Sequence, residues 1–350
     1  MSKLINFGAG PAALPEEVLN EAAIAVKDYK GSGLSILEIP HRGHLFLDLL
    51  TEANALVLEL LQLNEEYKVI WMQGGGRLQF CMLPLNFLKS IAGYIDSGHW
   101  AAEAMAQANL YGNTKIIASS KDKNYKFIPP VTAIPEAYDY IHFTTNNTIF
   151  GTQLQEIPQA TAPLIADMSS EILSRAFDYS KFKLIYAVAQ KNLGAAGVTL
   201  AVVHQSLLAT EVRPLPDILS YQAMARQNSL VNTPPVFGIY TSLLMLRWIK
   251  TKGLNKLFDQ NKEKAKLLYQ SIDNHPKFYG VADPGSRSSM NVCFRLEAEE
   301  DNKRFLDFCL NRNITGIKGH RSVGGFRASI YNAISPEDVN HLVQAIQDFE

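Results

Sequence analysis

The chain contains 350 residues, of which 47% are hydrophobic, so it can bury a large core and form two domains. Its 33 basic and 34 acidic residues give a net charge of -1, which argues against a polyanionic partner and leaves phosphate recognition to local clusters. No segment has the length of a membrane span and the N-terminus lacks a secretory apolar region, so we expect a cytoplasmic protein.

The first part of the chain alternates helical and strand patterns. Pro15 suits the first turn of a helix that runs to about Tyr29, because Glu16 and Glu17 come next, where the helix dipole favours acids. Further helices are expected over 47–63, 78–88 and 100–110, and strands over 67–72, 91–96, 114–118, 140–144, 163–167, 182–189 and 198–203. This alternation predicts an α/β domain with a mostly parallel sheet.

The pattern changes after His204. Two long helices are expected over 236–252 and 256–272, then strands over 290–296 and 325–331 and helices over 302–311 and 336–349. We therefore predict a large domain of residues 16–252. A smaller α+β domain would be formed by residues 1–15 and 253–350.

Two polar residues stand directly after buried strands in the middle of the chain. Asp167 ends the strand expected over 163–167, and Lys191 comes after the strand expected over 182–189. Burial disfavours an ammonium, so we expect the pKa of Lys191 to fall and its amine to attack an aldehyde. Pyridoxal 5'-phosphate also needs a carboxylate that keeps its ring nitrogen protonated. The pair therefore points to a site for this cofactor.

Several turns carry groups that suit the rest of such a ligand. The glycines before Arg77 let backbone amides approach a phosphate, Trp100 could stack on an aromatic ring, and Thr148 offers a hydroxyl. Asn232 and Thr233 precede two prolines that hold their turn rigid. Taken alone, these features also fit a plain turn, a core tryptophan and polar loops. The ligand-binding and the purely structural interpretation both stay open.

Two clusters place arginine and histidine beside glycine. Arginine donors match two oxygens of a carboxylate or phosphate at once, and a neighbouring glycine permits close approach, so both clusters are predicted to bind anions. The first cluster contains His41 and Arg42, and the second contains His320, Arg321 and Arg327.

Cysteine and histidine usage predicts neither disulfides nor a metal. Cys81, Cys293 and Cys309 are too few and too scattered for a disulfide framework, and their apolar neighbours predict reduced core thiols. His41 and His44 have a spacing that could suit a metal, but no clustered carboxylate or cysteine supports one.

Taken in chain order, these motifs resemble the phosphoserine aminotransferases, a family of the class V aminotransferase group. The resemblance covers essentially the whole chain, and the motifs are specific only as a set. They include Phe7-Gly8-Ala9-Gly10-Pro11, His41-Arg42-Gly43, Gly74-Gly75-Gly76-Arg77, Gly98-His99-Trp100, Ala166-Asp167-Met168-Ser169-Ser170, Ala189-Gln190-Lys191-Asn192, Asn232-Thr233-Pro234-Pro235, Lys318-Gly319-His320-Arg321 and Arg327-Ala328-Ser329.

The resemblance implies a fold-type I pyridoxal phosphate enzyme that binds its cofactor in the large domain and forms a homodimer with sites at the subunit interface. It implies that Lys191 binds the cofactor aldehyde and that Asp167 pairs with the pyridine nitrogen. The other cofactor-binding residues would be Gly76, Arg77, Trp100, Thr148 and Gln190, with Asn232 and Thr233 reaching across from the other subunit. The substrate-binding residues would be His41, Arg42, Arg77, His320, Arg321 and Arg327.

The implied activity is transamination between 3-phosphohydroxypyruvate and L-glutamate, giving O-phospho-L-serine and 2-oxoglutarate in serine biosynthesis. Two alternatives remain: another class V reaction, such as alanine–glyoxylate exchange or cysteine desulfuration, and a non-enzymatic module that binds phosphorylated metabolites. Use of the phosphorylated hydroxythreonine precursor of vitamin B6 is also open. Gly8 and Ala9 depart from the family's frequent serines, and Asn147 and Phe150 stand where acidic residues are expected.

Overall fold

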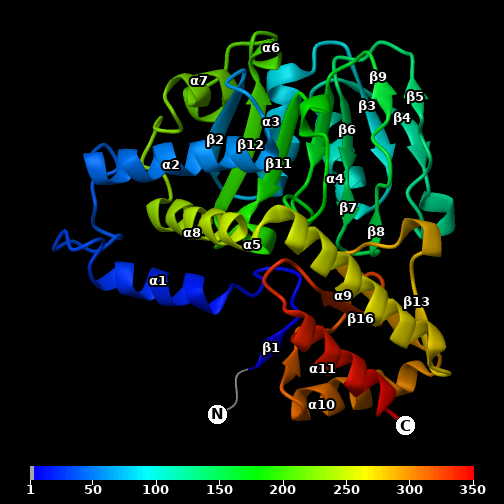
Figure 1. The fold of residues 1–350 in the computed structure, drawn as a ribbon. Helices are drawn as coiled ribbons and strands as arrows, with labels where there is room; N and C mark the ends of the chain where they lie inside the picture. The colour runs from blue at the N-terminus through cyan, green and yellow to red at the C-terminus, as the bar shows by residue number, and fades with distance from the viewer. Residues whose placement is uncertain (1–3) are drawn as a thin grey trace.

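A seven-stranded sheet forms the centre of the larger part of the molecule (Figure 1). The computed structural model describes residues 4–350, so the first three residues of the predicted 1–15 segment lie outside the described residues. Neighbouring strands are parallel except at β12, which is antiparallel to both neighbours, and this confirms the expected mostly parallel sheet. In sheet order the strands are β2 (Tyr67–Gln73), β12 (Val198–His204), β11 (Leu184–Val188), β10 (Leu164–Asp167), β6 (Ile141–Thr144), β3 (Ile91–Asp96) and β4 (Asn113–Ser119).

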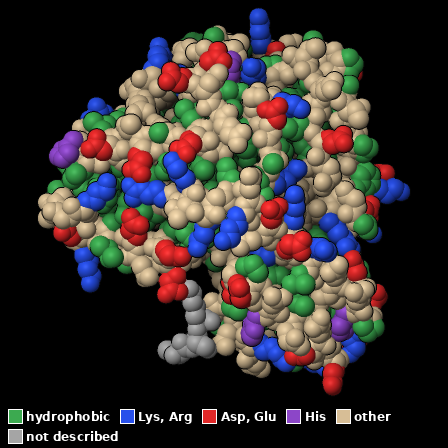
Figure 2. Space-filling view, viewed as in Figure 1, with side chains coloured by type: hydrophobic (Ala, Val, Ile, Leu, Met, Phe, Trp, Pro, Cys, Tyr) green, Lys and Arg blue, Asp and Glu red, His purple; other side chains and the backbone are tan. Residues whose placement is uncertain are grey.

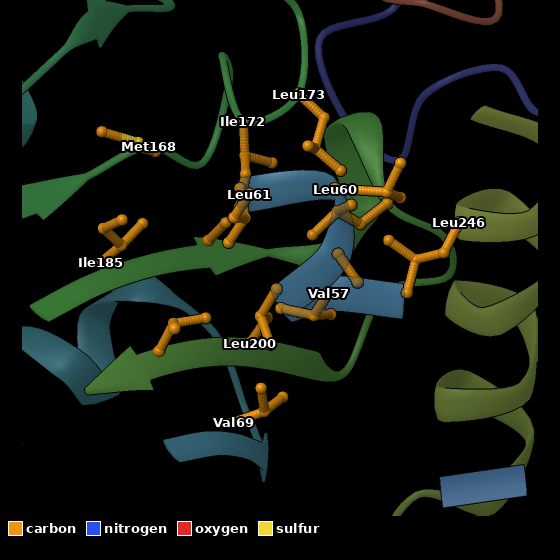
Figure 3. Packing of buried hydrophobic residues seen from close by; sticks show 14 of the residues in the cluster. Val57, Leu60, Leu61, Val69, Met168, Ile172, Leu173, Ile185, Leu200 and Leu246 are labelled. Atoms are coloured by element: carbon orange, nitrogen blue, oxygen red, sulfur yellow. The ribbon is translucent and has the colours of Figure 1, made fainter. Parts of the chain in front are cut away.

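Helices cover both faces of this sheet and bury it. Figure 3 shows Val57 and Leu61 of one helix and Leu246 of another packed near Leu200 of β12. These helices are α2 (His44–Leu61) and α8 (Val236–Lys252), and α1 (Glu16–Lys27) packs against α8. The opposite face carries α3 (Gly76–Phe87), α4 (His99–Ala108), α6 (Gln205–Leu208) and α7 (Tyr221–Arg226). Burial on both faces explains why the central strands are apolar almost throughout.

A second apolar core forms around the C-terminal region. Phe7 is fully buried in it, because β1 (Ile5–Asn6) pairs in parallel with β15 (Ile314–Thr315). The remaining elements of this region are β13 (Phe278–Gly280), β14 (Asn291–Leu296), β16 (Phe326–Ser329), α9 (Leu254–Asn274), α10 (Asn302–Asn311) and α11 (Pro336–Gln347). The division into residues 16–252 and residues 1–15 with 253–350 stays a prediction.

Local boundaries differ from the sequence prediction at two places near the carboxyl ends of the sheet strands. The helix expected over 78–88 begins at Gly76, so the glycine turn forms its N-terminus. The strand expected over 182–189 ends at Val188, and a helical turn, α5 (Ala189–Asn192), comes next. This turn forms because the N–H groups of Leu193 and Gly194 both donate to the Ala189 carbonyl, at 3.0 and 2.8 Å.

The sequence predicts neither β1 and β15 nor four further two-residue strands, because pairings this short carry no readable periodicity. The four further strands are β5 (Ala133–Ile134), β7 (Asn146–Asn147), β8 (Thr152–Gln153) and β9 (Gln159–Ala160).

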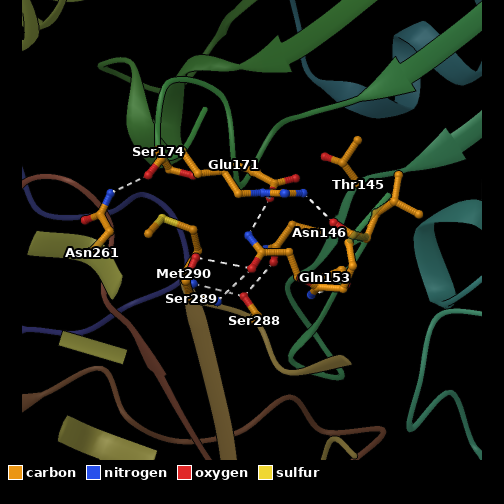
Figure 4. Close-up of polar contacts among 12 residues, drawn as sticks. Thr145, Asn146, Gln153, Glu171, Ser174, Asn261, Ser288, Ser289 and Met290 are labelled. Atoms are coloured by element: carbon orange, nitrogen blue, oxygen red, sulfur yellow. Dashed lines mark hydrogen bonds and ion pairs between the residues drawn. The ribbon is translucent and has the colours of Figure 1, made fainter. Parts of the chain in front are cut away.

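A buried polar network joins the segments after β6 and β10 to the start of β14 (Figure 4). Asn146 donates to the Ser170 hydroxyl at 2.8 Å and to Asn291 at 2.7 Å. Gln153 accepts from the backbone N–H of Ser289 at 3.0 Å. Because buried polar groups are costly unless paired, this network fixes the relative placement of segments that are distant in sequence.

Glu171 is the buried anion of this network. Its carboxylate is fully buried and accepts hydrogen bonds from Gln153 and from the Arg175 guanidinium. We expect Glu171→Ala to lower the free energy of unfolding by about 3 kcal/mol, because it leaves a mostly buried arginine unpaired. Urea titration followed by circular dichroism measures this.

Glu263→Ala is the matched control, because Glu263 forms an exposed pair with Lys266 at 4.0 Å. Such pairs contribute about 0–1 kcal/mol. Equal urea midpoints for the two variants would contradict the importance of the buried network.

Charged side chains of both signs are interspersed on the face shown in Figure 2, in keeping with the near-neutral balance of the sequence. Among the described residues, no helix has the length and apolarity needed to cross a membrane.

Candidate active site

The carboxyl ends of three neighbouring strands meet at one cavity of about 380 Å³. Thr144 ends β6, Asp167 ends β10 and Val188 ends β11, and all three line it. In open α/β sheets, ligands bind in the crevice outside the carboxyl ends of the strands. The other lining residues are Gly75, Gly76, Arg77, Phe80, Trp100, Asn146, Ser169, Ser170, Gln190 and Lys191.

Lys191 projects into this cavity from the helical turn α5. Its Nζ donates to the Thr148 hydroxyl at 2.9 Å, which brings the predicted Thr148 to the amine. Burial lowers the pKa of Lys191 to about 8, an effect that Asp167 partly offsets and Arg327 reinforces. This shift increases the fraction of neutral amine, which is the form that a nucleophile requires.

A lowered pKa alone does not select Lys191. Burial also lowers the pKa of Lys264 on α9, to about 7. The Lys264 amine, however, donates to the carbonyls of Ile330, Tyr331 and Ile334 at 3.1, 2.9 and 2.8 Å, and it does not line the cavity. Three acceptors occupy its three donors, so Lys264 is a structural residue and Lys191 is the reactive candidate.

Asp167 faces the same cavity from the end of β10. The side chain is buried, and its Oδ1 accepts from the backbone N–H of Ser169 at 2.9 Å. A carboxylate that already has a backbone donor is held in one orientation. Lys191 and Asp167 therefore present an amine and a carboxylate to one enclosed space.

The glycine turn and Trp100 form other walls of the cavity. Gly75 and Gly76 lie at the N-terminus of α3, where backbone amides and the helix dipole favour an anion. The Arg77 guanidinium lies over the Trp100 ring at 5.8 Å and pairs with Glu103 at 2.9 Å. This ion pair is exposed and so costs little to exchange for a ligand.

Histidine and arginine side chains gather beside Trp100. The His320 ring lies 6.2 Å from His99, which itself packs on Trp100 at 4.9 Å. Burial first, and then the charges of Arg327, His99 and Arg321, lowers the pKa of His320. Arg327 donates to the Thr148 carbonyl at 3.4 Å, and its buried Nε has no partner within residues 4–350. The second predicted anion cluster is thus brought together near His99 and Thr148, although none of its three residues lines the cavity itself.

The first predicted anion cluster lies elsewhere in the chain. Arg42 donates to His41 at 3.3 Å and to the Leu230 carbonyl at 3.3 Å, and neither side chain lines the cavity. Asn232 lines a separate, smaller cavity, and the carbonyl of Thr233 accepts from Gln73 at 2.8 Å. The structure therefore groups residues 41–42 with 230–233, outside the walls of the main cavity.

The sequence analysis does not select several lining residues as site residues. Thr144, Asn146, Ser169 and Ser170 all lie at or just after the buried ends of β6 or β10. The rule that ligands bind at carboxyl ends of parallel strands could have identified them once Asp167 was chosen.

The residues that depart from the family pattern have structural contacts. The carbonyl of Ala9 accepts from the Tyr331 hydroxyl at 3.0 Å, and the N–H of Gly8 donates to Asn6 at 2.9 Å. Asn147 donates to Thr152 at 3.0 Å within the β7–β8 pair, and Phe150 packs on Tyr125. None of the four lines the cavity.

The prediction that all cysteines are core residues is wrong for Cys81. It is half-buried on α3, where its thiol contacts Gln107 of α4 at 3.7 Å, because this side of α3 faces a neighbouring helix instead of the sheet. Cys293 and Cys309 are buried, and burial raises the pKa of both thiols to about 12. No described group of His, Cys, Asp and Glu side chains could hold a metal ion.

The cavity fits pyridoxal 5'-phosphate. Its volume lies in the range of small-molecule sites, and it offers an amine, a carboxylate and glycine amides in one space. Trp100 Nε1 and Thr144 Oγ1 belong to residues that line it, and both atoms are buried without a hydrogen-bond partner in the described part of the chain. Buried polar atoms are normally paired, so these two favour a polar ligand at this position.

Comparison with known proteins identifies the enzyme class to which this chain belongs. The model of the class-V aminotransferases matches residues 4–342, and the fold is that of an aminotransferase that uses pyridoxal 5'-phosphate. A phosphoserine aminotransferase of Flavobacterium johnsoniae is 48% identical over 99% of this chain and 98% of its own. The chain therefore belongs to the phosphoserine aminotransferase family within that class.

Solved structures agree with this assignment. The phosphoserine aminotransferase from Bacillus circulans subsp. alkalophilus has a TM-score of 0.96 and 45% identity, covering 99% of this chain and 98% of its own. The phosphoserine aminotransferase from Trichomonas vaginalis, solved with pyridoxal phosphate bound, has a TM-score of 0.92 and 34% identity, covering 99% of this chain and 100% of its own.

Proposed function

We propose that this protein transfers the amino group between L-glutamate and 3-phosphohydroxypyruvate, giving O-phospho-L-serine and 2-oxoglutarate in serine biosynthesis. The observation that carries the proposal is the placement of Lys191 and Asp167 in one cavity, with Arg327 close enough to Lys191 and His320 to lower, after burial, the pKa of both. The full-length similarity to phosphoserine aminotransferases supports the choice of substrates.

Lys191 and Asp167 would carry the chemistry. Pyridoxal phosphate, when bound, supplies an aldehyde for amine exchange and a ring that accepts electrons. The Lys191 amine would bind the aldehyde and, once displaced by the donor, move the proton at the substrate Cα as general base and acid. Asp167 would hold the ring nitrogen protonated.

The remaining walls would orient the cofactor. Trp100 would stack on the ring, Thr148 would bind its hydroxyl, and Gly76, Arg77 and Gln190 would bind its phosphate. Thr148 is well placed for its role because it already accepts from the Lys191 amine at 2.9 Å.

The arginines and histidines would bind the substrates. Arg42 and Arg327 are proposed for carboxylates, and His41, Arg77, His320 and Arg321 for the substrate phosphate. One pocket must accept a carboxylate from glutamate and a phosphate from the oxoacid. Arginine and histidine suit both anions, because their donors match either oxygen geometry.

We further propose a cytoplasmic homodimer with shared active sites. The grouping of His41 and Arg42 with Asn232 and Thr233 supports it, because these binding candidates do not line the cavity of their own chain. In a dimer they would complete the site of the other subunit. Binding of the phosphorylated hydroxythreonine precursor of vitamin B6 would require no further protein side chain, because this compound also carries a phosphate.

A cysteine desulfurase is disfavoured by the thiols. Such an enzyme needs a reactive, accessible cysteine in its site, whereas Cys293 and Cys309 are buried with raised pKa values and Cys81 does not line the cavity. An enzyme for small oxoacids that have no second charged group would leave His320 and Arg321 without a ligand.

Arg321→Ala tests the proposed role of Arg321 in binding the substrate phosphate. We expect kcat/KM for 3-phosphohydroxypyruvate to fall about tenfold to a hundredfold, because a hydrogen bond to a charged group is lost, while KM for glutamate changes little. Steady-state assays with phosphorylated and unphosphorylated hydroxypyruvate measure both effects.

Arg312→Ala is the matched control, because Arg312 pairs with Asp348 at 3.1 Å at a site remote from the cavity. Equal efficiency of the wild-type protein on the phosphorylated and unphosphorylated oxoacids would contradict the proposed substrate.

A further inference from the structure

A buried polar chain lies beneath Asp167 on the sheet face covered by α3 and α4. Asp167 on β10 is in register with Tyr186 on β11, and His142 on β6 is in register with Ile165, two residues before Asp167. Side chains alternate along a strand, so His142, Tyr186 and Asp167 point to the same face. Neither His142 nor Tyr186 lines the cavity.

Two of the three side chains are in direct contact. His142 Nε2 lies 2.9 Å from the Tyr186 hydroxyl, and both residues are fully buried. The Tyr186 side chain lies beside Asp167, because the two residues are in register on neighbouring strands and point to the same face, and burial first, and then the Asp167 carboxylate, raises the pKa of Tyr186. Asp167 accepts from the backbone N–H of Ser169 at 2.9 Å, and the Tyr186 hydroxyl is the side-chain donor next to it.

The number of available donors fixes the direction of the hydrogen bonds that link His142, Tyr186 and Asp167. Burial lowers the pKa of His142 to about 3, so the ring is neutral and has a single N–H. His142 Nδ1 is buried, and no described residue pairs with it. A proton on Nδ1 would therefore have no acceptor, whereas a proton on Nε2 can be donated to the Tyr186 oxygen. The Tyr186 hydroxyl is then free to donate to Asp167, and every donor in the chain is used.

We propose that Tyr186 and His142 are positioning residues that act through Asp167. His142 orients the Tyr186 hydroxyl, and this hydroxyl holds the Asp167 carboxylate as an acceptor aimed at the cofactor's ring nitrogen. The inference rests on the proposed role of Asp167 and extends it to two residues that never touch the cofactor. Such outer partners commonly set the orientation and basicity of the group they contact.

Tyr186→Phe removes only the hydroxyl and keeps the ring in its packing. We expect the 15N resonance of ring-labelled pyridoxal phosphate in the holoenzyme to move towards the value of a neutral pyridine. We also expect cofactor affinity to fall about tenfold, because Asp167 loses the hydrogen bond that the inference assigns to the Tyr186 hydroxyl. A purely structural role would lower the melting temperature without moving the ring nitrogen signal.

Tyr94→Phe is the matched control. The Tyr94 hydroxyl is 2.9 Å from that of Tyr140, and it is equally buried in the same apolar cluster without contacting Asp167. The 15N signal of the cofactor ring in the Tyr94→Phe holoenzyme should equal that of the wild type. A wild-type signal in Tyr186→Phe would overturn the inference.

His142 supplies a second test if Tyr186→Phe does not fold. His142→Leu should move the ring nitrogen signal in the same direction, and His142→Gln, which keeps a donor, should restore it. An unchanged signal in His142→Leu would overturn the inference.

Asp167→Asn separates this inference from the proposed function. A moved signal in Asp167→Asn with an unmoved signal in Tyr186→Phe overturns the inference alone. An unmoved signal in Asp167→Asn overturns the role of Asp167 itself, and the inference with it.

Discussion

Lys191→Ala is expected to abolish transamination, with a loss of at least about 10⁴-fold in kcat. The variant removes both the nucleophile that binds the aldehyde and the base that moves the Cα proton. The geometry makes Lys191 hard to replace: it lines the cavity, its pKa is lowered to about 8, and its amine is hydrogen-bonded to Thr148. A coupled assay of 2-oxoglutarate release over many turnovers measures the loss.

Lys183→Ala is the matched control, because Lys183 precedes β11, at the other end of that strand from Lys191. It should retain wild-type turnover. Multiple turnovers by Lys191→Ala at a measurable rate would contradict the assignment of the reactive amine.

Asp167→Asn is expected to lower kcat/KM by about a hundredfold or more. An amide cannot supply the negative charge that keeps the ring nitrogen protonated, and losing one preorganised electrostatic group typically costs this much. Cofactor absorbance and steady-state kinetics on the same preparation would show whether the loss lies in binding or in turnover.

Asp96→Asn tests whether any buried strand-end carboxylate would have the same effect. Asp96 ends β3, is also buried, and accepts from Ser119 at 2.7 Å and Tyr125 at 3.1 Å, but it does not line the cavity. We expect near wild-type kinetics. A similar loss in both variants would argue against a specific role for Asp167.

The features that sequence alone predicts are those with local signals. Sequence spacing predicts helix α8 over 236–252 and helix α10 over 302–311, as the structure has them, because their apolar positions and flanking residues are continuous. Asp167 and Lys191 could be chosen because each stands at the end of an apolar run, and a residue at the end of a buried strand is itself drawn towards the interior.

The features that sequence does not predict depend on contacts between distant segments. The bond between His142 and Tyr186 joins residues on different strands, and Asn146 meets Asn291 from the other end of the chain. No local pattern marks either contact. The placement of His41 and Arg42 beside Leu230 likewise results from packing and not from their glycine-flanked motif.

Mapping of the covalent attachment site tests the central claim most directly. The purified holoprotein would be reduced with borohydride, digested, and its cofactor-labelled peptide sequenced by mass spectrometry. The account predicts a yellow protein whose label lies on Lys191. A label on Lys264, a buried lysine whose pKa is also lowered, or a colourless protein that takes up no added cofactor, would contradict it.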